Sequence, residues 1–206
     1  MLPTPAQITA RRSAFRQLHA SGCFAIPNPW DAGSARYLAQ LGFKALASTS
    51  SGHAWSQGHA DGGMPLPAVL DYLRSLVAAT DLPVNADFEH GFADDAAGVA
   101  RNVALAVDTG VAGLSIEDST GRPDAPLLPL DEAVQRVRAA RAAIDASGQD
   151  VLLVEGRLQR RSTMPGGSES DLLVEIFGVR HAGVVRSHQG RDIDKILGGG
   201  QLSGAR

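Results

Sequence analysis

The stretch Leu82-Pro-Val-Asn-Ala-Asp-Phe-Glu-His-Gly91 is followed further along the chain by Leu114-Ser-Ile-Glu-Asp118. Each stretch is a short apolar run that ends in carboxylates. A run of this length between turn residues predicts a buried strand. Because parallel α/β folds place their chemistry at the ends of neighbouring strands, the two stretches indicate both a fold class and the position of a site.

Carboxylates from three successive parts of the chain are predicted to meet at this position. Asp87 and Glu89 are two residues apart, so in an extended backbone both side chains leave the same face. Asp61 precedes this strand, and Glu117 ends the next one. Because crowded carboxylates repel one another without a cation, the four residues predict a hard divalent ion, Mg²⁺ or, as the alternative, Mn²⁺.

The composition is that of an ordinary globular protein with one core. The chain has 206 residues, of which 44% are hydrophobic and 20% charged, and a formal net charge of -3. No apolar run approaches the ~18 residues of a membrane span, so we expect a cytoplasmic protein with no membrane partner. Cys23 is the single cysteine, which excludes an intrachain disulfide and a thiolate metal site. A near-neutral charge without a basic stripe argues against a nucleic-acid partner.

Strand and helix signals alternate through the first three quarters of the chain. Strands are predicted at 24–27, 44–49, 84–87, 112–117 and 151–154, with helices at 31–41, from Pro65 to Val77, from Asp94 or Asp95 to Gly110, and at 130–144. Five such units predict a parallel sheet with right-handed crossovers. A closed (β/α)₈ barrel and a doubly wound open sheet both fit. The absence of a Gly-x-Gly-x-x-Gly or Walker-type sequence disfavours a nucleotide-binding open sheet.

The pattern breaks after Arg157. Residues 158–206 lack a clear period and are rich in Gly, Ser and Arg. We interpret residues 1–157 as the N-terminal part of a (β/α)₈ barrel with five recognisable βα units. Residues 158–206 are then a divergent, truncated or frame-altered end and not a separate domain, since a full barrel takes about 250 residues. An open five-stranded sheet would expose an unpaired edge.

Several motifs in this order resemble the isocitrate lyase/phosphoenolpyruvate mutase superfamily over residues 24–157. They are Pro27-Asn-Pro-Trp-Asp-Ala-Gly-Ser-Ala35, Ser48-Thr-Ser-Ser-Gly52, Asp61-Gly62, Asp87-Phe-Glu-His-Gly91, Ile116-Glu-Asp118 and Val154-Glu-Gly-Arg157. The resemblance implies a (β/α)₈ barrel that binds Mg²⁺ and acts on a small carboxylate. It also implies a homo-oligomer if the barrel closes.

The resemblance also implies roles for individual residues. Asp87 would bind the metal most directly, and Asp61, Glu89 and Glu117 would hold it directly or through water. The substrate would contact residues near the ends of the first, second and fifth predicted strands, namely Trp30, Ser48, Ser50, Ser51, Gly52 and Arg157. Ser50, Glu117 and Arg157 are the residues expected to take part in catalysis.

Each assignment has a plainer structural alternative. The carboxylates could be solvated strand ends or helix caps, Asp31 an N-cap, the serines turn formers and Arg157 a surface residue. Three loop histidines are alternative acid–base groups, namely His53, His59 and His90.

The segment after the fourth predicted strand departs from the superfamily. Residues 119–129 contain neither the Cys of the lyase branch nor the Lys of the mutase branch. We therefore expect an Mg²⁺-dependent enzyme that acts on a 2-oxo or 2-hydroxy carboxylate through a metal-stabilised enolate, with carbon–carbon lyase chemistry favoured. The alternatives are a phosphonomutase or P–C bond-cleaving enzyme and a catalytically defective barrel fragment.

Overall fold

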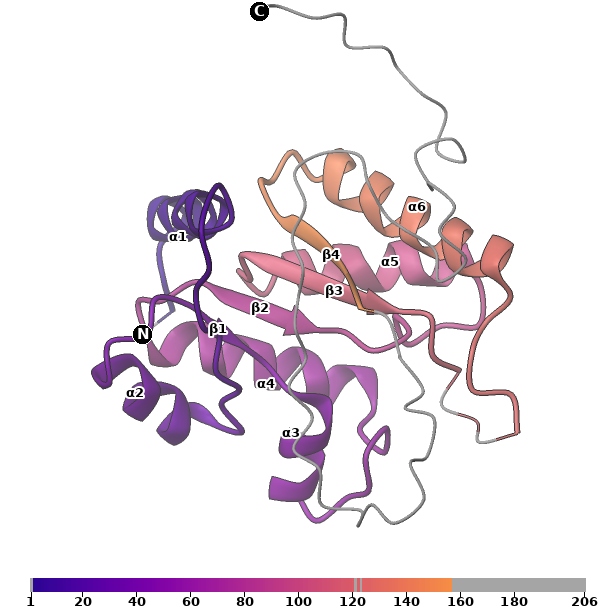
Figure 1. Ribbon diagram of the computed structural model, residues 1–206, viewed down its shortest axis with the longest axis horizontal. Helices are drawn as coiled ribbons and strands as arrows, with labels where there is room; N and C mark the ends of the chain where they lie inside the picture. Colours follow the sequence, from indigo (N-terminus) through magenta and orange to yellow (C-terminus); the bar gives the residue numbers. More distant parts are fainter. Residues whose placement is uncertain (1, 121, 123, 157–206) are drawn as a thin grey trace, which may run out of the picture. The chain divides into compact units, whose positions relative to one another are not determined.

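A computed structural model describes residues 2–120, 122 and 124–156 (Figure 1). Arg157 and the predicted C-terminal segment 158–206 lie outside the described residues. The strands are β1 Leu46–Ala47, β2 Val84–Asp87, β3 Gly113–Glu117 and β4 Leu152–Gly156. The helices are α1 Pro5–Leu18, α2 Ala32–Gln40, α3 Ser50–Ser56, α4 Leu66–Ala79, α5 Ala96–Val107 and α6 Leu130–Ala146.

The four strands form one parallel sheet in the order β1-β2-β3-β4. Asp87 of β2 is in register with Ser115 of β3, and Glu117 of β3 with Gly156 of β4. The predicted α/β fold with a parallel sheet is therefore confirmed. The strand predicted at 24–27 is not formed, although the Ala47 N–H donates to the Pro27 carbonyl at 3.1 Å. Pro27 has no N–H of its own and so cannot continue a ladder.

Local capping signals fix where the predicted helices begin. Asp31 caps α2 by accepting the Ser34 N–H at 2.7 Å, and Asp95 caps α5 by accepting the Gly98 N–H at 2.6 Å. Pro65 precedes α4, as predicted, and the buried face of α4 carries the apolar side chains that gave the helical spacing. These ends were predictable because a cap satisfies N–H groups within one turn of the chain.

Two helices are absent from the sequence-based prediction. α1 begins at Thr4, whose side chain accepts the Gln7 N–H while the Gln7 side chain accepts the Thr4 N–H. This Thr-Pro-x-Gln capping box is readable in the sequence. α3 begins within the serine-rich segment that we interpreted as a turn, and Thr49 caps it.

The two faces of the sheet are covered differently. Outward side chains such as Val84, Leu114 and Ile116 pack in one buried cluster with α4, α5 and α6. On the other face Phe15 of α1 packs so closely over Gly113 that a Cβ there would lie 2.5 Å from its ring. α1 therefore closes the amino-terminal end of this face, and its carboxyl-terminal end is left for polar groups. Within the described ranges no helix has the length and apolar character of a bilayer span.

Candidate active site

Asp87 lies at the carboxyl end of β2 and is held by groups from the neighbouring strand and helix. The Ser50 N–H donates to Asp87 Oδ2 at 2.8 Å. The Ser48 hydroxyl accepts the Asp87 N–H at 2.8 Å. The segment that joins β1 to α3 therefore fixes both the backbone and the carboxylate of Asp87, with the first N–H of α3 directed at the negative charge.

Glu89 follows Asp87 but not in the way that we predicted. Its φ of 45° is left-handed, so β2 has already ended and the alternation of an extended strand does not bring the two side chains together. A tight turn does so instead. The Glu89 N–H points to Asp87 Oδ1 at 3.4 Å, and the Glu89 carbonyl accepts the Glu117 N–H at 2.8 Å. Glu89 is therefore tied to the ends of both β2 and β3.

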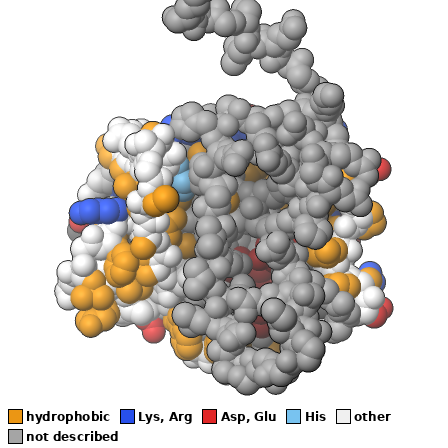
Figure 2. Space-filling model, viewed as in Figure 1, with side chains coloured by type: hydrophobic (Ala, Val, Ile, Leu, Met, Phe, Trp, Pro, Cys, Tyr) orange, Lys and Arg blue, Asp and Glu red, His pale blue; other side chains and the backbone are white. Residues whose placement is uncertain are grey.

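Asp61 and Glu117 are the other two carboxylates of the predicted acidic group. Asp61 lies in the exposed segment between α3 and α4, and the ideal Cβ position of its neighbour Gly62 lies 4.0 Å from Glu89 Oε2. Glu117 is the last residue of β3, next to the β2 end. Acidic atoms are visible near the middle of the view in Figure 2, where Figure 1 shows the arrowheads of the strands. Among the residues that the structure describes, no three acidic, His or Cys side chains are arranged so that they could hold a metal ion by themselves.

Burial and neighbouring charge raise the pKa values of Asp87 and Glu89. Burial, followed by the negative charges of Asp87 and Asp61, raises the pKa of Glu89 to about 7. Burial also raises the pKa of Asp87, while hydrogen bonds from Ser50 and the Glu89 N–H act in the opposite direction and the charge of Asp61 adds to the rise. A nearby cation would stabilise the ionised form of such a desolvated acidic pair with a third carboxylate close by.

Of the remaining predicted substrate residues, those that the structure describes form a wall on the β1 side, namely Trp30, Ser48, Ser51 and Gly52. A Cβ on Gly52 would lie 2.5 Å from the Trp30 indole, so the absence of a side chain at this position lets the ring pack against α3. Trp30 is 46% exposed and meets Trp55 edge-on. The Ser51 and Thr49 hydroxyls lie 3.3 Å apart. Ser48 is buried, so its hydroxyl is used within the fold.

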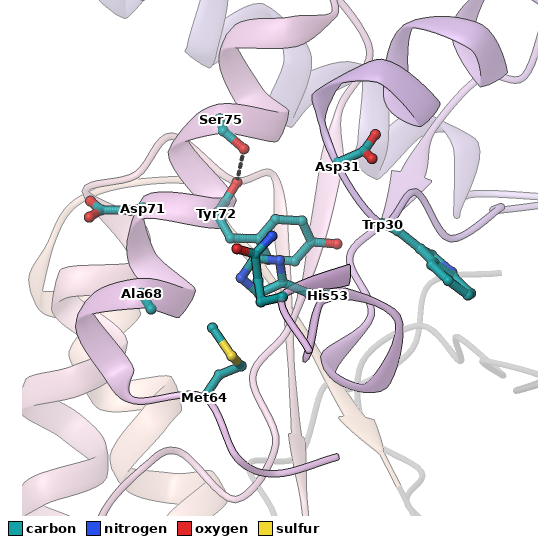
Figure 3. A pocket seen from close by; sticks show the side chains of 9 residues that line it. Trp30, Asp31, His53, Met64, Ala68, Asp71, Tyr72 and Ser75 are labelled. Atoms are coloured by element: carbon teal, nitrogen blue, oxygen red, sulfur yellow. Dashed lines mark hydrogen bonds between the residues drawn. The ribbon is translucent and has the colours of Figure 1, made fainter. Parts of the chain in front are cut away.

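A pocket of about 350 Å³ lies beside this wall but does not include the carboxylates of the sheet. It is lined mainly by α4, together with His53 of α3 and with Trp30 and Asp31 just before α2. The His53 ring stacks on Tyr72 with the ring centroids 3.8 Å apart (Figure 3). The Tyr72 hydroxyl donates to the Pro29 carbonyl at 2.6 Å and accepts the Thr49 N–H at 3.4 Å. Burial lowers the pKa of His53 and raises that of Tyr72. Tyr72 therefore joins α4 to the two segments that flank the site.

Sequence reasoning missed Tyr72 together with two residues that hold the β2–α5 segment, Asn102 and Arg136. Tyr72 carries a weak signal, since a tyrosine among the apolar positions of α4 needs a partner for its hydroxyl. His59 is exposed, and His90 lies in the β2–α5 segment beside Phe92. Arg157 lies outside the described part of the chain.

The profile of the phosphoenolpyruvate phosphomutase family matches residues 15–165, a range that begins in α1 and includes all four strands. The chain belongs to this family. The match confirms the resemblance read from the motifs, and its N-terminal limit extends into α1. In this phosphomutase-family chain, the Asp87 and Glu117 segments are consecutive parallel strands.

Relatives of this family member include named enzymes. An oxaloacetate decarboxylase of Pseudomonas putida is 36% identical over 146 residues, which are 66% of this chain and 50% of the relative. The crystal structure of a putative lyase/mutase from Burkholderia cenocepacia superposes with a TM-score of 0.71 at 46% identity, covering 73% of this chain and 55% of that one. A structure of oxaloacetate acetylhydrolase with its product oxalate has a TM-score of 0.66 at 27% identity, covering 73% and 54%. The chain thus spans about half the length of the relatives it matches.

Proposed function

We propose that this chain belongs to an Mg²⁺-dependent enzyme that acts on a small 2-oxo or 2-hydroxy carboxylate, with cleavage of a carbon–carbon bond. The observation that carries the proposal is the Asp87 carboxylate, which is held at the end of β2 by the Ser50 N–H and lies beside Glu89. The named relatives support the substrate class, since one is an oxaloacetate decarboxylase and another was solved with oxalate.

The acidic residues fit a hard divalent cation, for which we propose Mg²⁺ with Mn²⁺ as the alternative. Mg²⁺ takes oxygen ligands, keeps several of its waters and is usually bound by one or two carboxylates, so a complete protein cage is not required. Asp87 would hold the ion, with Glu89, Asp61 and Glu117 contacting it directly or through water. When bound, the ion would stabilise negative charge on an enolate oxygen of the substrate.

The protein groups would orient the substrate around this point. Ser50 and Ser51 at the start of α3 would offer hydroxyl and N–H donors to a substrate carboxylate, and Trp30 would shape the pocket beside them. Arg157 would bind a second anionic group in a bidentate manner. Glu117, at the end of the neighbouring strand β3, would take part in catalysis beside the metal ion.

The same proposal places the described sheet in a (β/α)₈ barrel. All four strands are parallel and their spatial order follows the sequence, which supports a barrel, because a doubly wound sheet reverses its strand order at the point where ligands bind. A barrel closed by further strands would leave no sheet edge. On the resemblance to the superfamily, we further propose that the assembled enzyme is a homo-oligomer.

Thermal unfolding of the full chain with Mg²⁺ and oxalate tests the proposal. A ligand that binds only the folded state stabilises it by about 2.7 kcal/mol at a hundredfold excess over its dissociation constant. We expect an upward shift only when both are present, retained in the surface variant Asp131→Asn and lost in Asp87→Asn, which keeps the shape of the side chain. A broad, ligand-insensitive transition in the wild type would contradict the proposal and favour a defective barrel fragment.

P–C bond chemistry is the second candidate, because the matching family is that of phosphoenolpyruvate phosphomutase. Product analysis separates the two. Release of a keto acid from an oxaloacetate-type substrate would support carbon–carbon cleavage. Turnover of phosphonopyruvate alone would support the second candidate.

A further inference from the structure

The segment between β2 and α5, residues 88–95, has an unusual backbone. Glu89 has a φ of 45° and Phe92 a φ of 53°, and Gly91 between them has a φ of 82°. Left-handed backbone conformations are unfavourable for residues other than Gly, although Asn and Asp tolerate them better than most. Strained positions of this kind persist only where the surroundings hold them, and they gather at functional sites.

Arg136 of α6 is the first anchor of this segment. Its guanidinium donates to the Ala93 carbonyl at 2.6 Å and to the Asp94 carbonyl at 2.5 Å, with a longer contact of 3.4 Å to the His90 carbonyl. The Arg136 side chain is only 5% exposed, and its carboxylate partner is Glu132 at 2.9 Å. A buried guanidinium therefore uses its planar donors on the backbone of this segment, which a single ammonium could not match.

Asn102 of α5 is the second anchor. Its Nδ2 donates to the Gly91 carbonyl at 3.0 Å and to the Phe92 carbonyl at 2.9 Å. The Phe92 ring packs edge-on against Phe88, which is fully buried. Together Arg136 and Asn102 contact the carbonyls of all five residues from His90 to Asp94, immediately after Glu89.

We infer that Arg136 and Asn102 are positioning residues, which hold the left-handed turn that directs the Glu89 carboxylate toward Asp87 and thereby set the affinity of the metal site. The inference rests on the proposed function, since it assumes that Glu89 helps to hold the ion. Neither residue contacts Asp87 or Glu89 through its side chain in the described structure. Their effect is transmitted by the backbone, in the way that outer partners orient metal ligands.

The test compares Arg136→Met and Asn102→Leu, which keep side-chain bulk and remove the donors, with the surface control Arg74→Met. Arg74 pairs with Asp71 on α4, and its side chain is 44% exposed. The first measurement is amide hydrogen exchange in the metal-free full chain. We expect exchange at residues 89–94 to accelerate about tenfold or more in the two anchor variants and to stay unchanged in the control.

The second measurement is the affinity for Mg²⁺, by titration of each folded variant. We expect it to fall about tenfold in Arg136→Met and Asn102→Leu and to be partly retained in Arg136→Lys, which keeps a charge and fewer donors. If Arg136→Met does not fold, Asn102→Leu tests the same inference.

Two results would overturn the inference: unchanged exchange at residues 89–94 in both anchor variants, or a loosened segment with wild-type Mg²⁺ affinity. A wild-type chain that binds no Mg²⁺ would overturn the proposed function and the inference with it. The wild-type titration therefore distinguishes a failure of the proposed function from a failure of the anchors alone.

Discussion

Ser50 donates its backbone N–H to Asp87 Oδ2 over 2.8 Å, although the two residues are 37 positions apart in the chain. Ser48 accepts the Asp87 N–H from the other side. One strand therefore supplies the candidate metal ligand while its neighbour sets that ligand's orientation. Parallel pairing makes this possible, because it brings the carboxyl ends of β1 and β2 to the same edge of the sheet.

Replacement of Ser48 by Ala is expected to lower the free energy of unfolding by about 1–3 kcal/mol. The Asp87 N–H would lose its buried acceptor, and an unsatisfied buried donor costs this amount. Urea denaturation measures the change. The control is Ser56→Ala, since this exposed hydroxyl makes only local hydrogen bonds, to the His53 carbonyl and from the Gln57 side chain. An equally small effect of both variants would show that the Ser48 contact contributes little.

The stability of the metal-free chain is expected to fall as the pH rises from about 4.5 to 7. Burial and neighbouring negative charge raise the pKa of Glu89 from 4.5 to about 7 in the folded state. The folded chain therefore binds this proton more tightly than the unfolded chain. The stabilisation is complete below the unfolded pKa and is lost as the pH passes the folded pKa. The full pKa shift of Glu89 corresponds to a change of about 3 kcal/mol in the free energy of unfolding. Partial exposure of Glu89 to solvent makes the actual change smaller.

Urea denaturation between pH 4 and 8 tests this dependence in the wild type and in Glu89→Gln. The neutral amide should flatten the curve, while the surface variant Asp131→Asn should not. Mg²⁺ should stabilise the wild type more at pH 8 than at pH 5, because the ion competes with protons for the carboxylates. A wild-type curve that rises with pH in the absence of metal would contradict the prediction.

Gly52→Ala is expected to displace the Trp30 ring. In a helix this change ordinarily stabilises by about 1 kcal/mol. Here the new methyl group would lie 2.5 Å from the indole, so we expect a neutral or destabilising effect and a changed Trp30 environment. Fluorescence in a Trp55→Phe background reports Trp30 alone, since the chain has two tryptophans. The control is Ala142→Gly at an exposed position of α6, which changes helix propensity away from the α3 contact and should leave the spectrum unchanged.

Tyr72→Phe is expected to destabilise the chain by about 1–3 kcal/mol, because the buried hydroxyl is the partner of the Pro29 carbonyl and the Thr49 N–H. The matched control is Tyr37→Phe on α2, whose ring is 63% exposed. That change should stay within about 0.5 kcal/mol. Thermal and urea unfolding of both variants give the comparison, and equal effects would contradict a linking role for Tyr72.

Much of the fold was predictable because its signals are local. The apolar spacing of α4, the caps Asp31 and Asp95 and the short apolar runs of β2 and β3 each depend on residues within a few positions of one another. The strand predicted at Phe24–Pro27 was wrong, because an apolar run does not show whether its backbone N–H groups pair with a neighbouring strand. The capping box of α1 was readable but was not used.

The sequence by itself determined the parallel α/β class and the acidic residues at the strand ends, through hydrophobic spacing and residue chemistry. Only the tertiary structure decided how those carboxylates are held. The left-handed turn at Glu89 has no signature in the nearby sequence. Arg136, which holds the following segment, lies 43 and 42 positions from Ala93 and Asp94, whose carbonyls it contacts. Hydrogen bonds between distant segments depend on packing of the whole sheet and its helices, and no short stretch of sequence encodes that packing.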